Sequence, residues 1–461
     1  MAERHNMNER LYDNKTIRKE IYFLIIPVIL ENIFQMSAGL VSAAMIGRLT
    51  PTLISAQGIS ARVTGVLWCL FKGIGIGATV LIAKTYGEGD VAKCKKTFEL
   101  SALTGVIISF ITVIVVLFNI KNIVAFFTPV EDTMYNASKY LKIVIFTSPF
   151  VLIMATVTGV YQGHGNTKTP MFISIVVNII NVILGYLLIY GKFGLPRLEL
   201  VGAGIALLLS QASGAFLGLF LLYNKQIGFF STYENENIFK LDFSIIKEVY
   251  SIGIPAAFEN MFWQLSAVIM SKIILSYGEI TFSAYQLGLQ AEMLSEMPAV
   301  GVGIAATSLT ANAIGSKDEK LLKAYTKQLL KTAALISGIS SLLIIFFPGA
   351  FMNLFTNIQE IKAIGMKYLI AMGFIQIPQN LSKVLNGAIR SAGYKNTPML
   401  ISFFGIWVVR IPLALLFAYV LKLNIIFIWI CMDIDQITKC IISAVVFKIK
   451  KINTIPQIQE A

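Results

Sequence analysis

The sequence predicts an all-α integral membrane protein with twelve transmembrane helices in two homologous six-helix bundles, related by a pseudo-two-fold axis along the membrane normal. Of its 461 residues, 56% are hydrophobic and only 14% are charged. The mean hydropathy of +0.73 is too high for a soluble globular protein. Apolar runs of about 20 residues or more recur along the chain, and each can cross a hydrocarbon core of roughly 30 Å as a helix. An internal repeat divides these runs into two equal sets.

The apolar runs predict the spans and their orientation. The predicted spans cover residues 20–46, 54–83, 97–120, 139–163, 170–190, 202–224, 247–277, 283–314, 326–349, 366–388, 398–420 and 424–447. Lys and Arg cluster in alternate connections, including the N-terminal segment and the C-terminal tail. Because basic segments stay on the cytoplasmic side, we expect a multi-pass protein of the plasma (inner) membrane with both termini in the cytoplasm.

A shift of 228 positions (255 − 27) aligns the two halves of the chain without a gap. It places Pro27 and Glu31 on Pro255 and Glu259, and it continues to hold more than a hundred residues further on. Each half holds an even number of spans, so the halves share one orientation, and the substrate site of such parallel repeats lies between them near mid-membrane. The predicted parts are a cytoplasmic segment 1–19, a first lobe 20–224, a cytoplasmic linker 225–246, a second lobe 247–447 and a cytoplasmic tail 448–461.

Composition and motifs exclude several other functions. The net charge is +13, but the basic residues lie in short segments between apolar runs, so we expect no nucleic-acid partner. The four cysteines and two histidines form no metal-ligand or nucleophile pattern, which predicts no metal site and no enzyme activity. Gly73-Ile-Gly75-Ile-Gly77 lacks the Gly-Lys-Ser/Thr ending of a phosphate loop, and its small residues favour close helix packing. His164, in a glycine-rich turn, is interpreted as a solvated turn residue.

Polar side chains inside the spans mark the candidate site. On the first span, Glu31, Gln35 and Ser42 fall within about 40° of one another, which predicts a polar stripe facing the protein interior. Glu31 is either a functional carboxylate or a structural one bonded to its neighbours. On the tenth span a polar stripe recurs at helical spacing and cannot face lipid; it comprises Gln376, Gln379, Asn380, Lys383 and Arg390.

Glu292 and Glu296 lie one helical turn apart on the eighth span. Two desolvated carboxylates at this spacing repel each other, which favours a proton on at least one of them and predicts a proton carrier. The alternative is that these acids pair with Lys383 and Arg410 as buried ion bridges that fix helix packing.

Two other groups of charges remain open to two interpretations. Arg62 and Lys72 on the second span either snorkel to the interfaces or line the central cavity. On the last span, Asp433 and Asp435 are either solvated by a cavity or, in a structural role, paired with Lys439.

Several short motifs follow one another along the repeat. They are Gly47-Arg48-Leu49, Gly75-Ile-Gly77-Ala-Thr-Val, Gly163-His-Gly-Asn-Thr-Lys-Thr-Pro-Met171, Gly202-Ala-Gly-Ile-Ala206 and Ala388-Ile-Arg390-Ser-Ala-Gly393. In this order they resemble the multidrug and toxic compound extrusion (MATE) family of secondary transporters over nearly the whole chain. The resemblance implies two six-helix bundles around a cavity that opens alternately inward and outward. It also implies export of amphipathic organic compounds driven by H⁺ or Na⁺ as the coupling ion, with no cofactor.

Three positions depart from the pattern of that family. Members usually carry an Asp where this chain has Ser42, many have an acidic residue where it has Gly185, and some have an Asp where it has Gln379. Ion coupling is therefore expected mainly in the second lobe. The expected ion-coupling residues are Glu259, Glu292, Glu296 and Glu31. The expected substrate-cavity residues are Gln35, Ser42, Arg62, Asn178, Asn181, Gln379, Lys383 and Arg410.

Three functions are compared on this basis. The first is a secondary antiporter for multidrug or metabolite efflux, acting as a monomer on small organic substrates in the lipid bilayer. The second is an exporter or flippase of an anionic lipid-linked or peptide-like metabolite, whose phosphate or carboxylate group would bind cationic residues such as Arg62, Lys383 and Arg410. The third, a membrane enzyme or sensor, needs a catalytic cluster or a soluble domain, and the sequence shows neither.

Overall fold

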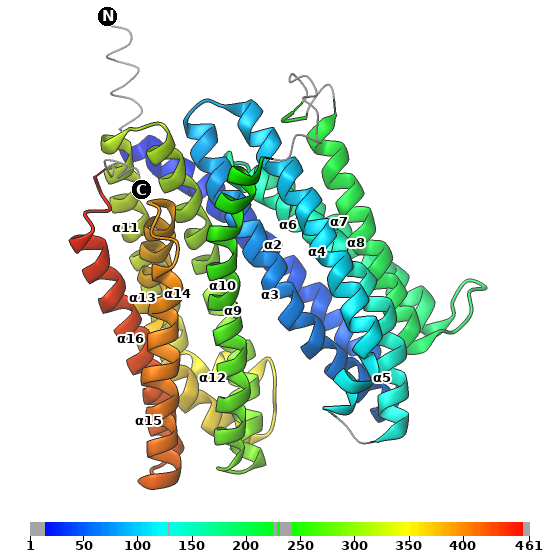
Figure 1. Ribbon diagram of the computed structural model, residues 1–461. Coiled ribbons are helices and arrows are strands. Elements are labelled where there is room, and N and C mark those ends of the chain that lie inside the picture. The colour runs from blue at the N-terminus through cyan, green and yellow to red at the C-terminus, as the bar shows by residue number, and fades with distance from the viewer. Residues whose placement is uncertain (1–13, 128–129, 225–227, 231–241, 455–461) are drawn as a thin grey trace, which may run out of the picture. The chain divides into compact units, whose positions relative to one another are not determined.

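The computed structural model describes residues 14–127, 130–224, 228–230 and 242–454, and within these ranges every regular element is a helix (Figure 1). The first half of the chain forms α2 (Asn14–Ile46), α3 (Pro51–Gly87), α4 (Val91–Ala125), α5 (Glu131–Val144), η1 (Ile145–Thr147), α6 (Ser148–Gly163), α7 (Lys168–Tyr190) and α8 (Glu199–Tyr223). The second half forms α9 (Phe243–Leu275), α10 (Glu279–Gly315), α11 (Glu319–Phe346), α12 (Pro348–Asn353), α13 (Gln359–Ser391), α14 (Thr397–Phe403), η2 (Phe404–Arg410), α15 (Ile411–Leu415), η3 (Leu416–Val420) and α16 (Ile425–Ile449).

Nine of the described helical stretches are long and apolar enough to cross a membrane. The long helices α9, α13 and α16 complete the twelve that the sequence predicts. Each of these three carries charged side chains within the span, among them Glu259, Lys383 and Asp435. The all-helical membrane fold is therefore confirmed. Much of the predicted segment 1–19, linker 225–246 and tail 448–461 lies outside the described residues.

Contacts divide the chain into two compact units. The α10 unit contains residues 1–29 and 258–461, and the α3 unit contains residues 30–257. Two helices, α2 and α9, therefore each begin in one unit and end in the other. The predicted lobes, 20–224 and 247–447, follow the sequence repeat alone and stay a prediction.

The first part of α2, up to Ile29, belongs to the α10 unit, and the first part of α9, up to Ala257, belongs to the α3 unit. These two exchanged half-helices pack into the cores of those units. In the α10 unit, Ile21 and Ile25 of α2 share a cluster with Val302 and Ala305 of α10. In the α3 unit, the corresponding part of α9, around Val249, shares a cluster with α3. Each exchange therefore buries apolar side chains on both helices, which is the main source of its stability.

Glycines allow the closest part of this packing. A Cβ atom on Gly73 would lie 2.5 Å from the carbonyl oxygen of Gly253, and one on Gly77 would overlap the carbonyl oxygen of Val249. Gly75, between them, faces α6, where a Cβ would lie 3.0 Å from the carbonyl oxygen of Ala155. The packing interpretation of this glycine motif is therefore confirmed, because each glycine meets backbone rather than a movable side chain.

Pro27 and Pro255 lie inside α2 and α9. Each is three residues before the position at which its helix enters the other unit, Leu30 and Phe258 respectively. A proline removes one backbone hydrogen bond and permits a bend there. The repeated prolines therefore mark the two crossings of the chain.

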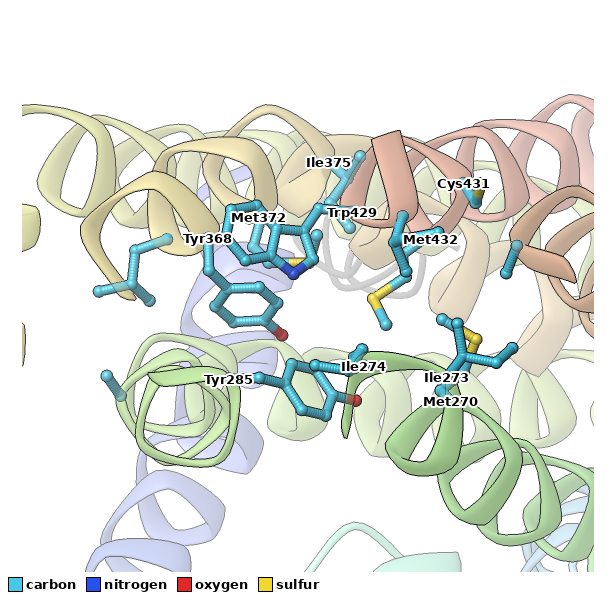
Figure 2. Packing of buried hydrophobic residues seen from close by; sticks show 14 of the residues in the cluster. Met270, Ile273, Ile274, Tyr285, Tyr368, Met372, Ile375, Trp429, Cys431 and Met432 are labelled. Atoms are coloured by element: carbon cyan, nitrogen blue, oxygen red, sulfur yellow. The ribbon is translucent and has the colours of Figure 1, made fainter. Parts of the chain in front are cut away.

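An aromatic cluster forms the core of the α10 unit beside the candidate site. Figure 2 shows Tyr285, Tyr368 and Trp429 meeting from α10, α13 and α16. The ring centroid of Tyr368 lies 5.5 Å from that of Tyr285 and 5.6 Å from that of Trp429, both nearly edge-to-face. This geometry is favourable for aromatic pairs and fixes the direction of the Tyr368 hydroxyl group.

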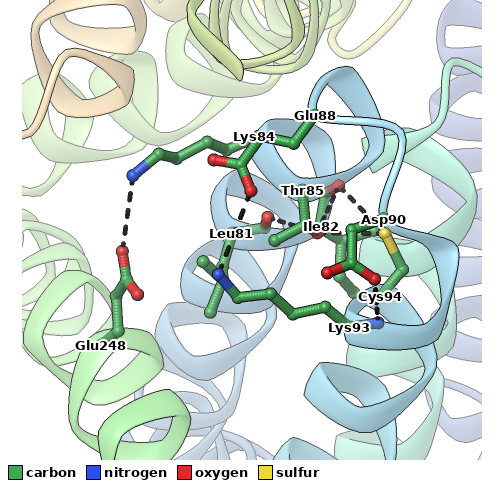
Figure 3. Close-up of polar contacts among 9 residues, drawn as sticks. All are labelled: Leu81, Ile82, Lys84, Thr85, Glu88, Asp90, Lys93, Cys94 and Glu248. Atoms are coloured by element: carbon green, nitrogen blue, oxygen red, sulfur yellow. Dashed lines mark hydrogen bonds and ion pairs between the residues drawn. The ribbon is translucent and has the colours of Figure 1, made fainter. Parts of the chain in front are cut away.

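Polar contacts tie the turn between α3 and α4 to α9 in the α3 unit (Figure 3). The Asp90 carboxylate accepts a hydrogen bond of 2.9 Å from the backbone N–H of Lys93 and so caps α4. Lys84 lies 3.9 Å from Glu248 of α9. The side chains of this ion pair are about one third exposed, so the pair aligns the half-helix more than it stabilises it.

The structure corrects the interpretation of His164. Its ring stacks on Phe229 at 4.1 Å and also contacts Tyr86 and Tyr161. The side chain is half-buried rather than solvated, and its Nδ1 atom lies 2.8 Å from the carbonyl oxygen of Val160. Burial lowers the pKa of His164, and the hydrogen bond to Val160 opposes that shift. The sequence could not show this cluster because Phe229 lies 65 positions further along the chain (229 − 164).

Candidate ion-coupling site

Glu259 of α9 is paired with a cation within the α10 unit. Its Oε2 atom accepts a hydrogen bond of 2.5 Å from Nη2 of Arg390, and its Oε1 atom accepts one of 3.3 Å from the Ser402 hydroxyl group. The exposed fraction of the Arg390 side chain is 10%. Glu259 therefore has a nearly buried guanidinium group as its counter-charge.

Glu296 of α10 meets the polar stripe of α13. Its Oε1 atom accepts hydrogen bonds from the Lys383 ammonium group and, at 2.8 Å, from the Gln379 amide. Both members of the Glu296–Lys383 pair are partly exposed. Gln379 and Lys383, predicted for the substrate cavity, thus contact Glu296, which is predicted for ion coupling.

Arg410 lies instead beside α16. Its Nη2 atom is 2.6 Å from Asp435, which is fully buried and also pairs with Lys439 at 3.0 Å. The π-helical stretch η2 ends at Arg410, and its Gly405 leaves room for Asp435, because a Cβ there would overlap the carboxylate. The structural interpretation of Asp435 and Lys439 is confirmed, and Arg410 belongs to the same ion group.

Glu292 is the buried acid that these pairs leave without a cation. Its exposed fraction is 8%. Its only side-chain hydrogen bond within the described residues comes from the Tyr368 hydroxyl group at 2.6 Å. The cations of the site pair with other acids; they are Lys383, Arg390, Arg410 and Lys439. A buried carboxyl group without a cation is accepted most readily in its neutral form.

Asp433, half-buried on α16, likewise makes no ion pair among the described residues.

Tyr368 is the site residue that the sequence interpretation missed. Its signal was the repeat, because the 228-position shift places Tyr140 on Tyr368. The sequence shows a tyrosine at this position in both repeats, but it does not show that Tyr368 contacts Glu292.

The remaining predicted residues lie in the α3 unit, where the contacts are neutral. The Ser42 hydroxyl group donates to Oδ1 of Asn181 at 3.2 Å, and the Asn181 amide donates to the Ser210 hydroxyl group at 3.2 Å. Ser42 therefore completes a neutral network at the position where a carboxylate was expected from the resemblance. Asn178 is bonded within its own helix, to the carbonyl oxygen of Ser174 at 2.9 Å.

Three residues of the α3 unit make no side-chain hydrogen bond or ion pair with the part of the chain that the structure describes. Glu31 is half-buried, and Gln35 and Arg62 are exposed. The structure thus brings Glu259, Glu292 and Glu296 into one unit and places Glu31 in the other.

Comparison with known proteins shows the family. The MatE family model matches residues 27–187 and matches again over residues 255–416. The chain belongs to the MatE family. The two matches begin 228 positions apart (255 − 27), which is the shift of the internal repeat. The resemblance to MATE transporters found in the sequence is therefore confirmed, and the protein is a membrane transporter rather than an enzyme.

Curated relatives extend over almost the full length of this MatE chain. It is 29% identical over 439 residues to "Probable multidrug resistance protein NorM" of Thermotoga maritima, which spans 94% of this chain and 92% of the relative. It is 26% identical over 423 residues to "Probable multidrug resistance protein YoeA" of Bacillus subtilis, at 90% of each chain.

Solved structures of MatE proteins share the fold. One is described as the outward-facing conformation of a multidrug resistance MATE family transporter of the MOP superfamily; its TM-score is 0.87 at 19% identity, over 94% of this chain and 96% of the other. A Pyrococcus furiosus transporter, described as having a binding pocket of reverse polarity, matches with the same TM-score, identity and coverage. At this identity the comparison shows the twelve-helix, two-bundle fold alone.

Proposed function

We propose that this MatE transporter is a secondary antiporter that exports small amphipathic organic cations in exchange for H⁺, by alternating access. The observation that supports the proposal most directly is the buried Glu292, whose carboxyl group has the Tyr368 hydroxyl group as its hydrogen-bond partner and no cation among the described residues. Such a group binds and releases a proton without breaking an existing ion pair.

The coupling follows from charge balance at Glu292. When Glu292 loses its proton, a negative charge develops in a buried position one helical turn from Glu296. A cationic substrate that approaches compensates the new charge, whereas a returning proton removes the charge and weakens substrate binding. Competition of H⁺ and an organic cation for one carboxylate is sufficient for antiport.

Glu259 and Glu296 have a different part in this proposal. Each already has a cation, Arg390 or Lys383, so each contributes to the local field in which Glu292 titrates. The Glu296–Lys383 pair is partly exposed and can rearrange when the charge of Glu292 changes. Na⁺ is the alternative coupling ion, and it would require oxygen ligands around the same carboxylate.

A second candidate function is export or flipping of an anionic lipid-linked or peptide-like metabolite. It is favoured by Arg62 and Lys72 of α3, both exposed and without an ion pair among the described residues. Exposed cations within a membrane helix would suit a phosphate or carboxylate group. For either function we propose a monomer in the plasma membrane with both termini in the cytoplasm.

The test is flux into proteoliposomes under an imposed gradient of either H⁺ or Na⁺. Ethidium serves as the cationic probe and carboxyfluorescein as the anionic probe. We expect ethidium transport driven by the pH gradient, and a loss of at least about tenfold in Glu292→Gln, which cannot release a proton. Glu131→Gln, an exposed acid in the first turn of α5, is the matched control and should transport normally.

The outcomes separate the candidates. Transport of ethidium driven by Na⁺ but not by the pH gradient would contradict H⁺ coupling. Transport of carboxyfluorescein alone, lost in Arg62→Gln, would favour the anionic cargo instead.

A further inference from the structure

Two amide side chains of α13 are buried without a protein partner. The exposed fractions of Gln376 and Asn380 are 0% and 2%. In both residues, neither the oxygen nor the nitrogen of the amide has a hydrogen-bond partner among the described residues. Because they are four positions apart on one helix, the two side chains lie on the same face, with their Cβ atoms about 6 Å apart. Nearly all buried polar groups in proteins are hydrogen-bonded, so these two require partners.

Contacts between helices locate the two amides. The helices α10, α11 and α13 all pack against one another. The Ser340 hydroxyl group of α11 donates to the carbonyl oxygen of Ser295 at 3.2 Å, and that of Ser341 donates to the carbonyl oxygen of Gly373 at 2.7 Å. Gln376 is three residues after Gly373 on α13, so it lies close to the level of Ser295.

Two hydroxyl groups at these levels are also buried without a partner among the described residues. They are the Ser295 hydroxyl group of α10 and the Thr332 hydroxyl group of α11. Thr332 is nine positions before Ser341, and Asn380 is seven positions after Gly373 on the antiparallel α13. At 1.5 Å of rise per residue, Thr332 and Asn380 lie within about 3 Å of the same level. Nine residues turn a helix through about 180°, so Thr332 lies on the opposite face of α11 from Ser341. The unpartnered groups that share one interior region are therefore Gln376, Asn380 and Ser295.

The other repeat shows that the fold does not need the Asn380 amide. The 228-position shift places Leu152 on Asn380 and Gly105 on Ala333. In the first repeat, Leu152 packs directly over Gly105, where a Cβ would overlap its methyl groups. An apolar side chain thus fills this position well in one copy, and the second copy has a polar group in its place.

The chemistry of these three side chains selects the ligand. Each amide offers an acceptor oxygen and a donor NH₂ group, and the Ser295 hydroxyl group can both donate and accept. A bound Na⁺ ion would satisfy the oxygens only and leave two NH₂ groups unpaired, whereas water satisfies donors and acceptors alike. The next residue before Asn380, Gln379, already donates to Glu296. Gln376 lies three positions before Gln379 on a neighbouring part of the same helix face, so the polar region adjoins the Glu296 contact.

We propose that Gln376 and Asn380, with Ser295, hold a cluster of buried water molecules between α10, α11 and α13, and that this water carries protons to and from Glu292. The water-binding part stands on the buried amides alone, and the proton-carrying part rests on the proposed H⁺ coupling. Gln376 and Asn380 are positioning residues in this scheme, because they hold water and do not titrate.

Two substitutions test the proposal with two readouts. Gln376→Leu removes one amide, and Asn380→Leu combined with Ala333→Gly copies the Leu152–Gly105 pair of the first repeat. Asn386→Leu is the control, because that amide is already bonded to Ser382 and Ser443. The first readout is the Tm in detergent, which does not depend on transport. The second is the rate of pH-gradient-driven ethidium flux, measured with pyranine as the internal proton indicator.

If water occupies the site, neither substitution raises the Tm, since each removes a satisfied hydrogen-bonding group. We also expect proton flux to fall at least about tenfold in both, while Gln376→Asn retains most of it. A clear rise in Tm for both Leu substitutions would show that the amides were unsatisfied and would overturn the water site. Parental proton flux in a stable Leu variant would overturn the proton path. Absence of flux in the parent protein would instead reject the proposed H⁺ coupling, and the Tm comparison would still test the water site.

Discussion

Replacement of Asp435 by Asn tests the ion group that surrounds α16. Asp435 is fully buried and is paired with Arg410 at 2.6 Å and with Lys439 at 3.0 Å. Their side chains are only 10% and 9% exposed, so Asn would leave two nearly buried cations without a counter-charge. Breaking a buried pair in this way costs about 3–5 kcal/mol. For a unit of 233 residues (29 + 204) this corresponds to a fall in Tm of roughly 10 °C.

Cys431 offers a local assay for this effect. Its thiol is buried one helical turn before Asp435 and donates to the carbonyl oxygen of Phe427 at 3.1 Å. In a chain whose other three cysteines are replaced by Ala, a thiol-reactive dye should label Cys431 only on unfolding of the α10 unit. Asp433→Asn is the matched control, because Asp433 makes no ion pair with a described residue. Equal labelling temperatures for Asp435→Asn and Asp433→Asn would refute the assigned energetic role of the ion group.

Two further predictions concern the α3 unit. Gly77→Leu should lower the free energy of unfolding by about 1–3 kcal/mol, because the new side chain would meet the backbone of Val249. Gly65→Leu is the control, because no atom lies within 4 Å of a Cβ at that position, and it should unfold like the parent protein in the same thermal assay. Because the pKa of His164 is lowered in the fold, stability should fall as pH decreases through the ordinary His value of about 6.5. His164→Phe should retain the stacking on Phe229 and lose this part of the pH dependence; an unchanged dependence between pH 7.5 and pH 5.5 would assign it to another group.

The repeat and the spans could be read from the sequence because they depend on local composition and on one ungapped shift. The same holds for the glycine motif, since Gly73 and Gly77 lie four apart on one helix face and their role needs only a close neighbour. The concentration of charge in the second repeat was also visible, because the shift places Thr64, not an acid, opposite Glu292. These conclusions use spacing along one helix, which sequence defines.

The pairings between helices could not be predicted in the same way. Lys383 and Arg410 were both possible partners of Glu292 and Glu296, and the choice depends on how α13 and η2 are rotated about their axes. The π-helical turns of η2 shift Arg410 toward α16 in a way that regular helical spacing does not describe. The exchange of the first halves of α2 and α9 was missed because a sequence repeat assigns each helix to its own copy.

The central claim is that Glu292 exchanges its proton for a cationic substrate. The most direct test is calorimetric titration of the detergent-solubilised protein with ethidium in buffers of different ionisation enthalpy, which counts the protons released on binding. The account predicts release of about one proton per bound ethidium in the parent protein and in Glu131→Gln, and almost none in Glu292→Gln. Equal proton release by the parent protein and Glu292→Gln would contradict it.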